Sequence, residues 1–348
     1  MILDNLRTTC EGRSPVVLAR HPEWFVDAVL GPRLSPSEAV LVTGFWRSGT
    51  TWLLEVLTRS LEAKAVFEPL DPKIGGYRSI STEYYHGTEK AISGFMPYVV
   101  DSLAERSSLR RHIVRSLTGA APGVFTRSAR VSIRANEGRD SSWSLIEAKE
   151  RLADALRNRV VVKFTRAHLL LPLLHSEFRP TIFHIRRDPR AVIESLIRQD
   201  WSEWIHEMSL VEYLLEPGDG RLEEFGKWAD DIRWCDQEGG RLAPLAGYWA
   251  LCEWYVDQYT GKERFDVSFE ELCRKGSDHL NASEQDQGFT VSPQVMGGES
   301  KTSDREKTVN DRIFGWKKRL ESEERHTIES VMYRFGMGHF LRSEEKGS

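Results

Sequence analysis

Residues 40–52 read VLVTGFWRSGTTW, and the rest of the sequence can be placed around this run. The apolar stretch 39–45 is rich in β-branched residues, which is typical of a buried parallel strand. Gly44 and Gly49 bracket a turn, and apolar residues then recur with helical spacing over 50–61. Strand, glycine turn and helix in this order predict a phosphate-binding loop, because the first N–H groups of a helix attract an anion.

The loop departs from the Walker pattern G-x-x-x-x-G-K-[ST] at its central position. Gly44, Gly49 and Thr51 fit the pattern, but Thr50 occupies the lysine position and the nearest cation is Arg47. In nucleotide hydrolases that lysine reaches the β- and γ-phosphates, and a strand-end acid helps to hold Mg²⁺. The sequence therefore predicts a ligand that is short in the phosphate direction and needs no metal.

Composition narrows the class of protein. The 348 residues are 40% hydrophobic and 29% charged, and the net charge of -4 argues against a general nucleic-acid binder. No stretch approaches the ~18 apolar residues of a membrane span, and the N-terminal residues lack the apolar run of a signal peptide. The four cysteines form no C-x-x-C pair, which suits a reducing compartment. We therefore expect a cytoplasmic protein without a membrane span, whose oligomeric state is open.

Further apolar runs extend the strand and helix pattern. Strands are predicted at 63–69, 159–164, 181–185 and 264–269. Helices are predicted at 189–198, 242–259 and 321–335. This alternation predicts an α/β fold with a central parallel sheet flanked by helices.

Three segments resemble motifs of the sulfotransferases that use 3′-phosphoadenosine 5′-phosphosulfate (PAPS). WRSGTTW (46–52) resembles their 5′-phosphosulfate loop, and its arginine is similar to that of the carbohydrate sulfotransferases, whereas cytosolic members carry lysine. IRRDPRAVIES (185–195) resembles the 3′-phosphate motif R-[DN]-P-[RK]-x-V-x-x-S. RIFGWKKRL (312–320) is similar to the C-terminal segment that closes over the nucleotide, without the usual R-K-G.

The resemblance implies a P-loop, three-layer fold in one domain spanning 1–348, with its motifs inside 39–320. It implies direct in-line transfer of a sulfuryl group from PAPS to a hydroxyl of a sugar, glycolipid or small natural product, without a metal. Segments 71–155 and 275–308 are then expected to be substrate-side insertions, the second a polar loop. The implied donor-binding residues are Arg47, Ser48, Gly49, Thr50, Thr51, Trp52, Arg187, Ser195 and Arg312.

The general base is the open choice among the expected catalytic residues, which are Arg47, Glu68, Lys163 and His168. Cytosolic sulfotransferases use the histidine of K-T-H-L-P, but here Thr165 stands two residues after Lys163 and His168 comes three residues later. Glu68 in VFEPL offers a carboxylate at a strand end, similar to an E-P pair in carbohydrate sulfotransferases. A structural acid that pairs with Arg47 or a backbone N–H is the alternative for Glu68. Lys163 is expected either to contact the leaving sulfate or to pair with an acid.

Two other functions fit parts of the pattern. A small-molecule kinase that uses Mg-ATP would need the missing lysine, and Asp188 would be its strand-end acid. A non-catalytic nucleotide-binding protein would keep the loops without a base. Within 185–195, Arg186 is expected to face away from Arg187, and Arg190 is expected at the surface. The aromatic residues of 247–255 are expected in the core.

Overall fold

The protein is described by a computed structural model over residues 34–68, 103, 157–165, 167–199, 207–215, 217, 220–259, 264–282, 289–296 and 308–344. Five strands form one sheet in which every described pair is parallel, in the order β2-β3-β1-β4-β5. The strands are β1 Val40–Thr43, β2 Lys64–Phe67, β3 Val160–Phe164, β4 Thr181–Arg186 and β5 Arg264–Ser268. The α/β fold with a central parallel sheet is thereby confirmed, and each predicted strand lies within one or two residues of its expected bounds.

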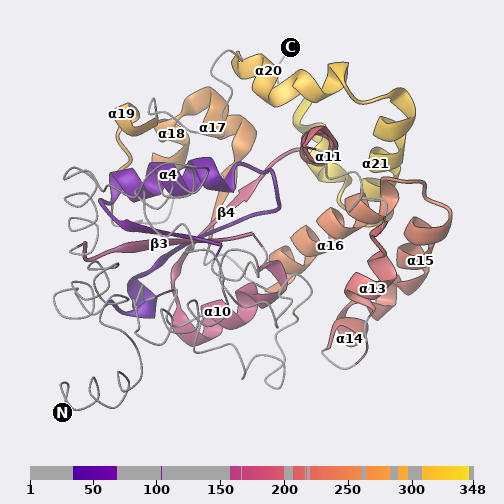
Figure 1. The fold of residues 1–348 in the computed structure, drawn as a ribbon, viewed down its shortest axis with the longest axis horizontal. Helices are drawn as coiled ribbons and strands as arrows, with labels where there is room; N and C mark the ends of the chain where they lie inside the picture. The colour runs from indigo at the N-terminus through magenta and orange to yellow at the C-terminus, as the bar shows by residue number, and fades with distance from the viewer. Residues whose placement is uncertain are drawn as a thin grey trace, which may run out of the picture.

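Helices cover both faces of the sheet. Side chains of successive β1 residues alternate, so Leu41 packs toward α10 while Val40 and Val42 pack toward α4. Figure 1 shows α4 with α17, α18 and α19 on one side of the strands and α10 on the other. These helices are α4 Thr50–Ser60, α10 Leu171–Phe178, α17 Phe269–Lys275, α18 Ser277–Asn281 and α19 Pro293–Met296.

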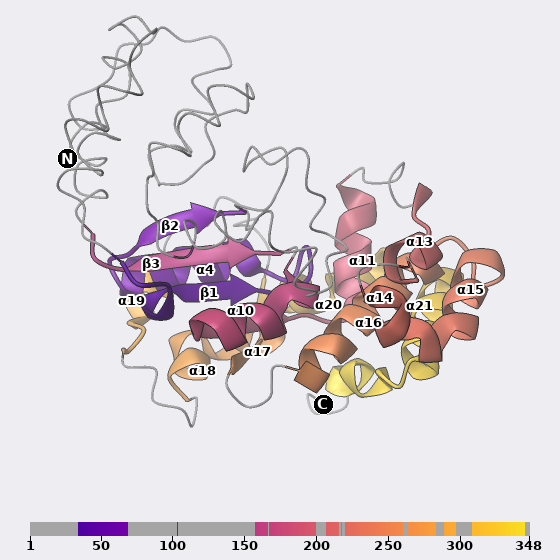
Figure 2. The same cartoon turned by 90° about the horizontal axis from the view of Figure 1, so that it is seen from below.

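A third group of helices packs beside the sheet, on the right in Figure 2. Tyr248, Trp249 and Tyr255 of α16 are buried at its centre and Trp254 packs against them, which confirms the prediction that the aromatic residues of 247–255 belong to the core. The helices are α11 Pro189–Arg198, α13 Leu210–Leu214, α14 Arg221–Phe225, α15 Ala229–Gln237, α16 Ala243–Tyr259, α20 Val309–Phe314 and α21 Ser322–Arg334. Short 3₁₀ turns connect the elements: η1 Pro36–Glu38, η2 His168–Leu170, η3 Gly226–Trp228, η4 Gly315–Lys318 and η5 Gly338–Glu344.

The close approach of β1 and β4 explains one glycine of the opening motif. Gly44 has φ 151°, and a Cβ built there would lie 2.3 Å from the carbonyl oxygen of Ile185. Real Cβ atoms do not come that close to backbone, so a side chain at this position would push the two strand ends apart. Because both strand ends carry site residues, the absence of a side chain at Gly44 is a condition for bringing those residues together.

Two sequence expectations need correction. Arg190 is buried, with 2% of its surface exposed, because its guanidinium binds both oxygens of Asp188 and also contacts Glu329 of α21. The polar run 275–308 is not a continuous loop, since it contains α18 and α19. Asn281 ties these two parts together by accepting a hydrogen bond from Val291 N and donating one to Val291 O.

Other expectations lie outside the described residues or stay predictions. Apart from Leu103, segment 71–155 is not described. The single-domain reading of the whole chain stays a prediction. Within the described ranges, none of the helices combines the length and apolar character that crossing a bilayer requires.

The burial of Arg190 leads to a stability prediction. Arg190→Met keeps much of the side-chain volume but leaves Asp188, itself 7% exposed, as a buried carboxylate without its cation. The free energy of unfolding should fall by about 3–5 kcal/mol, measured by urea denaturation. Arg233→Met is the matched control, because Arg233 pairs with the fully exposed Asp230 and its loss should cost about 1 kcal/mol or less. Equal losses for the two variants would contradict the structural role of Arg190.

Candidate anion-binding site

Two turns meet at the carboxyl ends of the neighbouring strands β1 and β4. The first is the glycine turn that leads into α4, and the second leads from β4 into α11. Arg47 of the first turn donates from Nε to the hydroxyl of Ser195 in α11, at 3.0 Å. Two residues separated by 148 positions, which the sequence assigned to one ligand, are therefore in direct contact.

Arg187 joins the two turns to the C-terminal part of the chain. Its guanidinium donates to the carbonyl oxygen of Arg47 at 3.0 Å and to that of Arg312 at 3.1 Å. It also lies over the ring of Phe269, 4.4 Å from the ring centre. Three of the predicted donor-binding residues thus converge on one location, although Arg312 of α20 contributes its main chain to this contact.

Among the residues that the structure describes, the charge of Arg187 has no counter-ion in direct contact. Within the described part of the chain, no carboxylate forms an ion pair with Arg187, and its Nε has no hydrogen-bond partner. Burial lowers the pKa of Arg187, and the nearby charge of Arg47 lowers it further, although Glu270 opposes the shift. Burial also lowers the pKa of Arg47, as does Arg198. A desolvated cation is costly without a partner, so the arrangement favours a bound anion.

The glycine turn itself leaves donors free for such an anion. Gly49 begins α4 with φ 96° and supplies no side-chain cap, so the first N–H groups of the helix are not covered by a capping side chain. The buried hydroxyl of Ser48 also lacks a hydrogen-bond partner within the part of the chain that the structure describes. A Cβ at position 49 would lie 2.7 Å from the ring of Phe269, which explains glycine there. Thr50 and Thr51 complete this first turn of α4.

Phe269 links the first helix turn to Arg187. Trp52 meets the ring of Phe269 edge-on, with ring centres 6.1 Å apart. The guanidinium of Arg187 lies over the same ring. Sequence analysis assigned Trp52 to the donor's adenine and did not single out Phe269. That assignment of Trp52 stays a prediction.

Glu68 and Lys163 form a buried pair at the ends of β2 and β3. Lys163 Nζ lies 3.0 Å from Glu68 Oε1 and donates to the hydroxyl of Thr51 at 3.1 Å. Thr165 donates to both Glu68 oxygens, from its hydroxyl at 2.6 Å and from its backbone N–H at 3.0 Å. Glu68 therefore accepts from a backbone N–H, as expected if it is a structural acid. The cation that pairs with it is Lys163 and not Arg47. The pair is connected to the glycine turn through Thr51.

Glu194 and Arg319 form a second contact that sequence reasoning missed. Arg319 donates to both oxygens of Glu194, at 2.5 and 3.0 Å, and this side-chain fork fixes the segment after η4 onto α11. Glu194 immediately precedes Ser195, so the ion pair holds the C-terminal segment against the helix that carries the predicted phosphate ligand. The separation of 125 residues gave no signal for this pairing in a single sequence.

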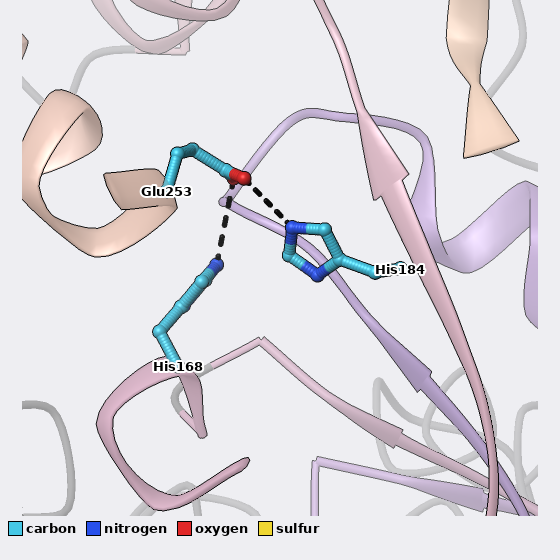
Figure 3. A group of neighbouring side chains, drawn as sticks. All are labelled: His168, His184 and Glu253. Carbon is cyan, nitrogen blue, oxygen red and sulfur yellow. Dashed lines mark hydrogen bonds and ion pairs between the residues drawn. The ribbon is translucent and has the colours of Figure 1, made fainter. Parts of the chain in front are cut away.

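His168 lies in a different environment from the anion-binding residues. It is 5% exposed and faces Glu253 of α16, which also binds His184 (Figure 3). Glu253 binds Arg186 as well. Burial lowers the pKa of His168 to about 4, so the ring is neutral near pH 7. Arg186 faces away from Arg187, as predicted. His184 and Glu253 were not predicted, because 69 residues separate them and neither lies in a motif.

Comparison with known proteins gives structural likeness alone. No family model matches the chain, and no curated protein matches it in sequence. The chain resembles the sulfotransferase domain from the curacin biosynthetic pathway at 14% identity, with TM-score 0.41 and coverage of 87% of this chain and 99% of that one. It resembles a Mycobacterium tuberculosis H37Rv sulfotransferase at 14% identity, TM-score 0.37, covering 91% and 79%. It also resembles the sulfotransferase domain of the Synechococcus PCC 7002 olefin synthase at 12% identity, TM-score 0.37, covering 86% and 96%. Likeness this distant carries no argument about substrate or cofactor.

The unpaired charge of Arg187 predicts anion-dependent stability. At constant ionic strength, sulfate should raise the melting temperature of the wild-type protein. At a sulfate concentration ten times Kd, the free energy of unfolding should increase by about 1.4 kcal/mol. Arg187→Met should lose this response, because the variant removes the desolvated charge that the anion would neutralise.

The control for this experiment is Arg233→Met, which removes an exposed cation in α15 and should keep the full response. Sulfate also stabilises proteins by exclusion from their surfaces, and this effect should be the same in all three proteins. An unchanged sulfate response in Arg187→Met would remove Arg187 from the anion site.

Proposed function

We propose that this protein is a sulfotransferase that transfers the sulfuryl group of PAPS to a hydroxyl of a sugar, glycolipid or small natural product. The observation that carries the proposal is the convergence of Arg47, Arg187 and Ser195 between two turns, where no carboxylate of the described residues is paired to Arg187. Two adjacent anion cradles suit a nucleotide with phosphates on both its 3′ and 5′ positions. The motif resemblance of 46–52 and 185–195 supports the same ligand.

The residues present fit the two phosphate groups of PAPS. Ser48, Gly49, Thr50 and Thr51 would hold the 5′-phosphosulfate at the start of α4, where backbone donors are uncapped. Arg187 and Ser195 would hold the 3′-phosphate, with the main chain around Arg312 and the anchored segment after η4 closing the site. Trp52 and Phe269 would supply the aromatic surface for adenine. PAPS supplies the activated S–O bond that breaks during transfer.

Arg47 is placed to serve both cradles. Its backbone lies in the glycine turn and its side chain reaches Ser195, so a small rotation would direct the guanidinium at either phosphate. In the reaction it would stabilise negative charge as the leaving phosphate oxygen separates from sulfur. The acceptor oxygen forms the new bond to sulfur, the bridging S–O bond breaks, and the hydroxyl proton must pass to a base on the protein.

Glu68 is the preferred base, and its contacts with neighbouring residues determine how many further hydrogen bonds it can accept. Lys163 and Thr165 occupy much of its accepting capacity, which leaves room for one more donor on a carboxylate. The rival His168 faces Glu253 within the core, where burial keeps its pKa near 4. Lys163 contacts Thr51 at the start of α4, so it would lie closer to the transferred sulfuryl group than His168 does.

The contacts of Asp188 weigh against the kinase alternative. Both of its oxygens are bound by Arg190, and the carboxylate also caps α11. This carboxylate is therefore committed to a buried ion pair and is a poor ligand for Mg²⁺. Thr50 at the lysine position of the loop supports the same choice.

The choice of nucleotide tests the proposal directly. Adenosine 3′,5′-bisphosphate should raise the melting temperature without added Mg²⁺, and Mg-ATP should do so weakly. Arg187→Met should weaken binding of the bisphosphate at least tenfold, measured by calorimetry, because a charged hydrogen bond contributes ~1.5–3 kcal/mol. Adenosine 5′-monophosphate, which lacks the 3′-phosphate, is the matched ligand and should lose much less affinity. Stabilisation by Mg-ATP equal to that by the bisphosphate would support a kinase and sink the PAPS assignment.

The base assignment is tested by Glu68→Gln. The substitution keeps the shape of the side chain, so nucleotide affinity should stay near that of the wild type. Sulfate transfer should fall by about 10²–10⁴-fold, the usual contribution of a general base. Turnover must be expressed per folded protein, because the variant also loses the buried pair with Lys163. Glu62→Gln changes an exposed glutamate just before β2 and should leave turnover unchanged.

A second variant separates the rival bases. Near-normal turnover of Glu68→Gln, beside a His168→Gln protein that binds nucleotide but transfers no sulfate, would move the base to His168. A loss of both affinity and turnover in Glu68→Gln would instead make Glu68 a structural acid of the loop.

A further inference from the structure

Three buried side chains meet in the core, apart from the anion site. His168 comes from η2, His184 from β4 and Glu253 from α16, and Figure 3 shows them pointing at one another. One possible ligand atom from each lies within 4.8 Å of the others. The side chains of His184 and Glu253 are fully buried, and 5% of that of His168 is exposed. The group is therefore a closed polar cluster that connects three separate elements.

The hydrogen bonding of this cluster is incomplete. Oε2 of Glu253 accepts from His184 Nε2 and from Arg186 Nε, each at 2.7 Å. Oε1 of Glu253, Nε2 of His168 and Nδ1 of His184 are buried and have no hydrogen-bond partner among the residues described. Nε2 of His168 and Oε1 of Glu253 are 3.9 Å apart, too far for a hydrogen bond. Each unsatisfied buried group is costly, and three of them in one place point to a missing ligand.

The unpartnered atoms of the cluster favour a cation as that ligand. A carboxylate oxygen and imidazole nitrogens that carry no proton are electron-pair donors, and they are the groups that bind divalent metals in proteins. Carboxylates of Glu253, Asp257 and Asp266 gather at this place, where Arg186 and Arg264 pair with them.

We propose that His168, His184 and Glu253 bind a divalent transition-metal ion, with zinc as the best match to two imidazoles and one carboxylate. Bonds from zinc to nitrogen and oxygen are ~2.0–2.2 Å long, so two ligand atoms on one ion lie at most about 4.4 Å apart. In a tetrahedral site two such atoms lie about 3.4 Å apart, so closing the cluster from within 4.8 Å requires movements of up to roughly 1.5 Å, which side-chain rotation can supply. Arg186 already holds one oxygen of Glu253 and leaves the other for the metal.

The metal would act on the architecture and not on sulfate transfer. It would join β4 to α16 and to the turn after β3, next to Phe45, whose ring centre is 5.8 Å from that of His168. Phe45 opens the glycine turn of the anion site. The ion would thus fix the base of that turn from the core side, and its presence does not depend on the identity of the nucleotide.

Metal content and metal-dependent stability test this proposal. The full chain should be produced with zinc in the medium, dialysed against metal-free buffer and analysed by elemental mass spectrometry. About one zinc ion per chain is expected. Removal by a strong chelator should lower the melting temperature, and zinc should restore it. Cobalt(II) loaded in place of zinc should give visible absorption bands of a site with nitrogen and oxygen ligands.

The variants locate the ion. His168→Gln should lower zinc affinity at least ~100-fold and abolish the cobalt bands. His326→Gln is the matched control, since His326 is an exposed histidine of α21 and its variant should keep the ion. Glu253→Gln is a second test, but it also disturbs the contact with Arg186. The proposal is therefore decided by His168→Gln and by chelation of the wild-type protein.

Several outcomes would overturn the proposal. One is a wild-type protein with less than ~0.1 zinc per chain and a melting temperature that neither zinc nor chelator changes. Another is zinc binding that survives in His168→Gln, because the ion would then lie elsewhere. In either case the cluster would be completed by a proton or by buried water.

Discussion

The guanidinium of Arg187 is the contact on which the arrangement of the anion site depends. It donates to main-chain carbonyls of Arg47 and Arg312, so it holds three segments together without using a carboxylate. Carbonyl groups orient a cation but do not cancel its charge. The site therefore keeps its shape without a ligand while its cation remains available to an anion. An aspartate in the place of either carbonyl would have closed the site to phosphate.

Three carboxylates near the site or in the adjoining core are paired with other cations. Asp188 binds Arg190, Glu194 binds Arg319, and Glu253 binds Arg186. Each pair removes a negative charge that would otherwise repel an anionic donor. Arg190 also contacts Glu329 and so fastens α11 to α21, while the pairs of Glu194 and Glu253 fasten α11 to the C-terminal segment and β4 to α16. The charge pattern that makes the site receptive to anions is thus also the pattern that assembles the helices around it.

The sequence predicts those parts of the fold that depend on local pattern. The apolar runs identify all five strands, and the eight-residue spacing of Arg187 and Ser195 placed both at the site. Arg190 was placed wrongly at the surface, because its burial depends on Glu329 of a helix far along the chain.

The remaining parts depend on contacts that one sequence does not reveal. His184 and Glu253 have no motif and meet through packing of α16 on the sheet. Phe269 is the last residue of the strand predicted at 264–269 and was given no role, yet it supports both Trp52 and Arg187. The helices within 275–308 were missed because their polar sequences resemble loops, whereas contacts such as that of Asn281 with Val291 hold them in place.

The strand order has a consequence for how the chain is made. In the sheet described, β1 lies between β3 and β4, and Val40 pairs with Val161 and Thr181. A ribosome that adds ~5–20 residues per second needs roughly 6–24 s after β1 emerges before its first neighbour is synthesised. During that interval the apolar strand next to the glycine turn has no partner. Chaperones are therefore expected to shield this strand in nascent chains of the protein until β3 emerges.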